Sequence, residues 1–109
     1  MESMEYVHFS PSEQAQLATA IGAAAHRAGE FEQALEWFNK AVEGGSAQAM
    51  CNLAVMYYKG QGVDKDEDKV RELLDRAEAL GEPAAAELRE RIRNGELDEP
   101  KEQIGRAHV

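Results

Sequence analysis

The stretch AQAMCNLAVMYYKGQGVDKDEDKVRELLDRAEALG, from Ala47 to Gly81, decides the fold of this chain. Its two halves carry apolar residues three and four positions apart, the spacing that places side chains on one face of an α-helix. These apolar residues are Ala49, Met50, Leu53, Ala54 and Tyr57 in the first half and Val70, Leu73, Leu74 and Ala77 in the second. Ser46 and Asp66 precede the halves as N-caps, and glycines follow both. We therefore expect two antiparallel helices, near 46–59 and 66–80.

The connector between these helices could instead be a binding loop. Three of its acidic residues imitate the first three ligands of a calcium loop, namely Asp64, Asp66 and Asp68. However, Lys69 stands where the sharp turn of such a loop needs glycine. Gly60 and Gly62 follow a helix rather than a strand, so a dinucleotide-binding loop lacks its context. We interpret the loop as a connector that turns at its glycines and buries Val63. We predict that it binds neither a metal nor a cofactor.

The same pattern extends to both sides of this hairpin. Upstream, SPSE at Ser10–Glu13 is a capping box for a helix near 11–28, and a second helix is expected near 30–43. Their apolar stripes are Leu17, Ile21 and Ala25 in the first helix and Ala34, Trp37, Phe38 and Ala41 in the second. Downstream, Pro83 opens a fifth helix that carries Leu88 and Ile92. We expect an N-terminal extension at 1–9, a repeat domain at 10–95 and a disordered tail at 96–109.

The two hairpins match each other residue by residue. In the second helices, Trp37, Lys40, Ala41 and Gly45 stand 36 residues before Leu73, Arg76, Ala77 and Gly81. In the first helices, Ile21 and Gly22 stand 32 residues before Leu53 and Ala54, so the connector of the second copy carries a four-residue insertion. An internal repeat of this length indicates a helical solenoid. We predict an all-α fold, a short right-handed α–α superhelix of two helical hairpins plus a C-terminal capping helix.

Residues 47–81 resemble a Sel-one-like repeat of the tetratricopeptide-like superfamily. The resemblance rests on the alanine and leucine before the tyrosines, on GQGVDKDE and on the closing glycine, while QALEWFNKAVEGG matches the second helix of the same pattern. The short turn RAGEFEQA is closer to a tetratricopeptide repeat. Val70 and Leu73 depart from the alanine and tryptophan of the family pattern. The resemblance implies stacked hairpins whose first helices line a concave surface that binds segments of partner proteins.

The charge and composition of the chain disfavour some classes of binding partner. The 109 residues carry a net charge of −9, which disfavours binding to nucleic acid and to anionic membranes because both need concentrated Lys and Arg. No stretch approaches the roughly 20 apolar residues that span a bilayer. The single Cys51 cannot form an internal disulfide, and the acidic N-terminus is unlike a secretory signal. The sequence predicts a cytoplasmic protein.

Mapping by the repeat anchors gives the candidate partner-binding face. Its residues are Gln16, Thr19, Ala23, His26 and Arg27 on the first helix and Gln48, Cys51, Val55, Tyr58 and Lys59 on the third. Their basic and aromatic members gather at one end, a patch suited to a carboxylate or an acidic peptide. Cys51 and His26 could also form a nucleophile pair, but no third orienting residue or oxyanion feature is evident. We predict no catalytic residue.

The sequence therefore predicts a protein–protein interaction scaffold or adaptor that binds a protein or peptide partner, as a monomer or weak dimer. The alternative is a docking or dimerisation module of a regulatory or enzymatic complex. An exposed apolar patch around Leu88 and Ile92 would favour that alternative.

The last residues, QIGRAHV, resemble a translated sequencing adapter. On that hypothesis Ile104 to Val109 are not native, and the native chain continues beyond Glu102. Sequencing of the intact genomic locus tests this, because a continuous gene that ends at Val109 contradicts it.

Overall fold

The computed structural model describes residues 9–98, which form five α-helices and, within that range, no strand. The helices are α1 (Pro11–Arg27), α2 (Phe31–Glu43), α3 (Ala47–Lys59), α4 (Glu67–Ala79) and α5 (Pro83–Arg93). This confirms the all-α fold and the five expected helices. The handedness of a superhelix stays a prediction. Most of the N-terminal extension (1–8) and the end of the tail (99–109), including 104–109, lie outside the described residues.

Side-chain caps begin α1, α3 and α4 at the residues that the sequence predicted. The Oγ of Ser10 accepts a hydrogen bond from the amide of Glu13, and the carboxylate of Glu13 accepts one from the amide of Ser10. Asp66 caps α4 by accepting a hydrogen bond from the amide of Lys69. Each cap satisfies backbone donors that a helix leaves without partners at its first turn.

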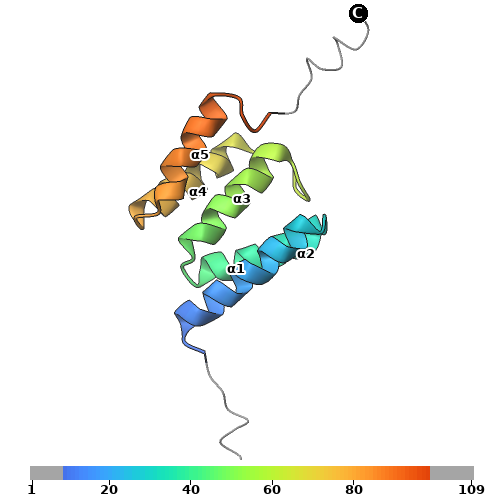
Figure 1. The fold of residues 1–109 in the computed structure, drawn as a ribbon, viewed down its shortest axis with the longest axis vertical. Coiled ribbons are helices and arrows are strands. Elements are labelled where there is room, and N and C mark those ends of the chain that lie inside the picture. Colours follow the sequence, from blue (N-terminus) through green and yellow to red (C-terminus); the bar gives the residue numbers. More distant parts are fainter. Residues whose placement is uncertain (1–8, 99–109) are drawn as a thin grey trace, which may run out of the picture.

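The helices form two hairpins that stack on each other (Figure 1). The first hairpin pairs α1 with α2, the second pairs α3 with α4, and α2 packs against α3 between them. The last helix, α5, packs on α4 and α3 and covers the far side of the second hairpin. Leu88 and Ile92 pack against the core there rather than forming the exposed patch that was considered above.

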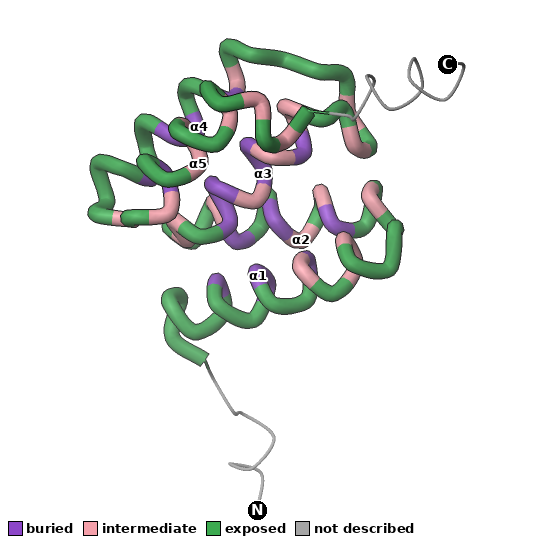
Figure 2. The backbone as a smooth tube through the Cα atoms, turned by 45° about the horizontal axis from the view of Figure 1, so that its top comes forward, coloured by how far each residue is buried: buried purple, intermediate pink, exposed green. Residues whose placement is uncertain are grey.

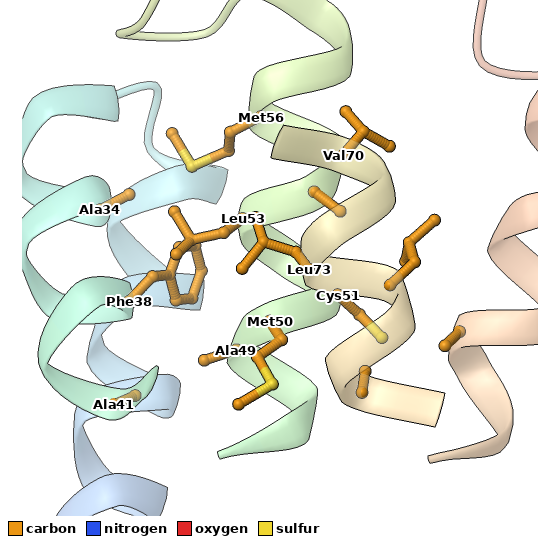
Figure 3. Packing of buried hydrophobic residues seen from close by; sticks show 14 of the residues in the cluster. Ala34, Phe38, Ala41, Ala49, Met50, Cys51, Leu53, Met56, Val70 and Leu73 are labelled. Carbon is orange, nitrogen blue, oxygen red and sulfur yellow. The ribbon is translucent and has the colours of Figure 1, made fainter. Parts of the chain in front are cut away.

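The core lies between the hairpins and combines a few large side chains with many small ones. Phe38 of α2 points toward Leu53 of α3, and both are almost completely buried (Figure 3). Six core alanines have no exposed surface: Ala34, Ala41, Ala49, Ala54, Ala77 and Ala85. Gly22 of α1 lies under the Phe38 ring, where an added Cβ would stand 2.6 Å from Cδ1 of Phe38. Small residues therefore set how closely the helices approach.

The buried face of α1 differs from the predicted stripe. Ala15, Ala18, Thr19 and Gly22 are its buried residues, and these lie on the side that faces the other helices (Figure 2). Leu17 and Ile21, predicted to face the core, are instead 45% and 42% exposed. The prediction was wrong because the close approach of α1 to Phe38 admits only small side chains, so the larger ones lie outside the contact.

The connector between α3 and α4 is a structured turn. Gly60 ends α3 in the left-handed conformation, with φ 73° and ψ 43°. Gly62, also at positive φ, packs against α2, where an added Cβ would stand 3.0 Å from the Cβ of Phe31. The amide of Asp66 then donates to the carbonyl of Tyr57, which closes the loop. Val63 is only half-buried, so it does not fill the core as predicted.

Candidate partner-binding face

A groove lies between α1 and α3, with the ring of Phe38 from α2 at its base. We call it the α1–α3 groove; it has a volume of about 200 Å³ and is lined by Ala23, His26, Arg27, Phe38, Asn52 and Val55. Four of these residues belong to the face that the sequence predicted, namely Ala23, His26, Arg27 and Val55. The two hairpins thus bring predicted positions from both first helices to one groove.

The exposed positions of α1 and α3 follow the repeat. On α3 they form a stripe of Gln48, Asn52, Val55 and Lys59, and on α1 the residues 32 positions earlier are Gln16, Ala20, Ala23 and Arg27. All eight residues are exposed or half-buried. Spacings of four and three residues keep such a stripe on one helix face.

Asn52 is the polar groove residue that the sequence analysis missed, while Phe38 was assigned to the core. The prediction placed Cys51 on this face instead, which is one position and about 100° away around the helix. Within the described part of the chain, the Asn52 carboxamide makes no hydrogen bond to another residue. Because a carboxamide both donates and accepts, Asn52 is suited to hydrogen-bond the backbone of a bound segment.

Two predicted face residues, Thr19 and Cys51, are buried and support the fold instead. Thr19 donates a hydrogen bond to the carbonyl of Ala15, and its Oγ1 lies 2.8 Å from the Oγ of Ser46. Ser46 also caps α3 by accepting a hydrogen bond from the amide of Ala49. Hydrogen bonds through Thr19 and Ser46 therefore connect α1 to the start of α3. These contacts correct the assignment of Thr19 to an open surface.

Cys51 is 4% exposed, so its thiol does not face a partner. Burial, with a smaller contribution from the charge of Glu82, raises the pKa of Cys51 from 9.0 to about 11. A thiol with this pKa is protonated at neutral pH and is a poor nucleophile.

His26 and Tyr58 are half-buried and are held by other segments. Nε2 of His26 lies 2.8 Å from Oε1 of Gln61, and its ring lies against Phe31 with 5.3 Å between the centroids. The Tyr58 hydroxyl donates a hydrogen bond to Asp98, which together with burial raises the pKa of Tyr58. His26 and Tyr58 thus connect the predicted binding face to the α3–α4 connector and to the residues after α5.

The contact from Tyr58 reaches the first residues of the predicted tail. A turn at 94–97 follows α5, so the tail predicted from residue 96 begins inside this turn, and Glu96 forms an ion pair with Arg91. The ordered structure therefore extends at least to Asp98, which lies beside the end of α3.

Arg27 and Lys59 supply the positive charge of the face. Both are exposed, and none of the carboxylates described lies within the 4.0 Å of an ion pair from either side chain. By contrast, Arg89 on α5 contacts both Asp75 and Glu78. Lys40, Lys65 and Arg76 likewise lack an ion pair within residues 9–98, so what distinguishes Arg27 and Lys59 is their position on the exposed stripes of α1 and α3 beside the groove.

Other kinds of site find no support in residues 9–98. They contain no group of three His, Cys, Asp or Glu side chains placed to hold a metal ion. None of the five helices has the length and apolar character that crossing a membrane requires.

The geometry of repeated helical hairpins agrees with the comparison with protein families. The model of the Sel1 repeat matches residues 23–46 and again residues 47–82. The chain belongs to the Sel1 repeat family. The second match covers α3, the connector and α4, which is the stretch from which the resemblance was inferred. Neither the comparison with curated proteins nor that with solved structures gives a match.

Membership of the family carries a general function. Sel1 repeats are helical hairpins that form non-catalytic scaffolds and generally mediate protein–protein interaction.

Proposed function

We propose that this Sel1 repeat protein is a non-catalytic adaptor of the cytoplasm that binds an extended acidic segment of a partner protein in the α1–α3 groove. The observation that carries the proposal is the pairing of exposed Arg27 and Lys59 with a groove that both first helices line. The 32-residue repeat sets these two cations at equivalent positions of the two hairpins.

The chemistry of the groove supports an extended peptide rather than a folded surface. Ala23 and Val55 offer apolar contact, and Phe38 forms a base for a small side chain. Asn52 adds a carboxamide for the peptide backbone, while Arg27 and Lys59 attract carboxylates of the partner. A groove of about 200 Å³ buries little surface, so we expect affinity on the order of micromolar and a strong decrease with added salt.

A binding experiment with charge-reversed variants tests this proposal. Peptides are first selected from a random library on the wild-type chain, and the affinity of one fluorescently labelled peptide is then measured. We expect the selected peptides to be rich in Asp and Glu. The double variant Arg27→Glu, Lys59→Glu should weaken binding at least tenfold while its helix content and melting temperature stay unchanged, because both side chains are exposed.

A matched control distinguishes the loss of contacts in the groove from the effect of a changed net charge on peptide binding. The variant Arg71→Glu, Arg76→Glu changes the net charge by the same amount on exposed positions of α4 and should bind the peptide nearly as tightly as wild type. In a second control, the connector variant, reversal of Asp64 in the connector and of Asp68 in the first turn of α4 should likewise leave the peptide bound. If the α4 variant or the connector variant loses the peptide while the groove variant keeps it, the proposed site is wrong.

A further inference from the structure

The outer face of the first hairpin is apolar, and no other helix of residues 9–98 covers it. Its groove, between α1 and α2, has a volume of about 500 Å³ and includes Leu17, Ile21, Trp37, Lys40 and Glu43 in its lining. We use the name outer face for this groove together with the exposed apolar side chains beside it. Three of the four large exposed apolar side chains described in the chain belong to α1 or precede it directly, namely Phe9, Leu17 and Ile21. A concentration of exposed apolar side chains on one face is typical of an interaction surface.

The internal repeat shows what kind of contact this face can make. Leu17 and Ile21 occupy the positions of Ala49 and Leu53, 32 residues later. Ala49 and Leu53 are 0% and 2% exposed because the second hairpin packs there on the first (Figure 3). The outer face is therefore the stacking face of a hairpin without another hairpin against it.

The charges of the outer face favour a second copy of the chain. The charged residues that line its groove are one cation, Lys40, and one anion, Glu43, one helical turn apart. The lining of this groove is thus neutral, with Glu13 next to it beside Leu17 and Phe9, although the whole chain has a net charge of −9. A two-fold axis that passes between these positions sets Lys40 of each copy near Glu43 of the other, an arrangement in which the face complements itself.

The helix α5 blocks head-to-tail stacking of copies, in which the outer face of one copy would pack on the second hairpin of the next. Head-to-tail stacking needs the rear of the second hairpin, but α5 covers it, with Ala85 completely buried and Leu88 packed on the core. An arrangement of outer face against outer face leaves α5 in place, whereas stacking on the second hairpin would displace it. We propose that the chain forms a two-fold symmetric dimer through its outer face, an inference independent of the proposed peptide groove.

Sedimentation equilibrium of the full chain over a range of concentrations tests the dimer. We expect association on the order of 10 µM toward twice the 12.0 kDa of one chain. The variant Leu17→Glu, Ile21→Glu should be monomeric with unchanged helix content and melting temperature, because both residues are already exposed. Leu80→Glu, at the 59% exposed apolar residue outside this face, should leave the dimer intact.

Charge exchange tests the symmetry. Lys40→Glu and Glu43→Lys should each weaken the dimer about tenfold, and the double exchange should restore it, because the two charges then meet with signs reversed on both copies. A wild-type chain that stays monomeric at all concentrations overturns the inference, even if the face binds a different helical protein. A dimer that tolerates Leu17→Glu, Ile21→Glu, or a double exchange that fails to restore association, also overturns it.

Discussion

Cys51 shows at the residue scale how burial decides between a reactive and a structural role. Its thiol is 4% exposed inside α3, and its pKa is raised to about 11. The sequence alone offered Cys51 both as a face residue and as half of a nucleophile pair. The structure leaves it neither role, because a protonated and enclosed thiol neither contacts a partner nor attacks a substrate.

We therefore predict that Cys51 reacts slowly with a thiol-alkylating reagent at about pH 7.5. The rise of its pKa from 9.0 to about 11 leaves roughly a hundredfold less thiolate, and burial slows the reaction further. The unfolded chain in denaturant is the control and should be labelled at the rate of a free cysteine. Equal rates in the folded and unfolded chain would contradict the burial of this residue.

The same pKa gives a dependence of stability on pH. The unfolded thiol loses its proton from about pH 9, whereas the folded thiol keeps it until about pH 11. The unfolded state therefore binds fewer protons in this interval, and the free energy of unfolding falls as the pH rises through it. In thermal melts, Cys51→Ala should lose less stability between pH 8 and pH 10 than wild type does. An identical decrease in both proteins would argue against a raised pKa.

The prediction from sequence was incomplete for which face of α1 meets the core and for which residues of α3 line the groove. In α1, two stripes have helical spacing, one of large apolar residues and one of small residues, and periodicity alone cannot say which meets the core. The ring of Phe38 decides, because a Cβ at Gly22 would already stand within 2.6 Å of it. On α3 the prediction missed Asn52 by one position, although its polarity beside buried Cys51 was a usable signal.

At the scale of elements, the sequence predicted the helices well because each has local signals. The caps at Ser10, Ser46 and Asp66 and the stop at Gly60 all stand where they were expected. The stripe of α4 was also correct, with Val70, Leu73, Leu74 and Ala77 all buried. These signals lie within a few residues of each other, whereas the burial of Thr19 depends on Ser46, which is 27 residues away.

Close packing of alanines gives the prediction that belongs to this scale. Ala41 has no exposed surface on α2, so Ala41→Leu should force strain and lower the free energy of unfolding by about 1–3 kcal/mol, as measured by chemical denaturation. Ala79→Leu introduces the same change at an exposed position of α4 and should have little effect. Two variants of equal stability would mean that α2 does not pack through Ala41.

At the scale of the whole molecule, the hairpins form two surfaces with different character. The α1–α3 groove has Arg27 in its lining and Lys59 on the adjoining stripe of α3, whereas the groove of the outer face is lined by apolar side chains with one cation and one anion. The repeat could be found in the sequence, but the outer face could not, because Leu17 and Ile21 had been assigned to the core. A dimer through the outer face leaves both α1–α3 grooves open, so one assembly would carry two peptide sites.

The most direct test of the central claim is where an acidic peptide binds. A selected peptide is titrated into the ¹⁵N-labelled chain, and the changes in amide chemical shift are mapped. The account predicts that the largest changes lie on facing stripes of α1 and α3, at Ala23, Arg27, Asn52, Val55 and Lys59, and that α4 and α5 stay unaffected. Changes centred on the connector at 60–66, or on α5, would contradict the claim that the α1–α3 groove is the binding site.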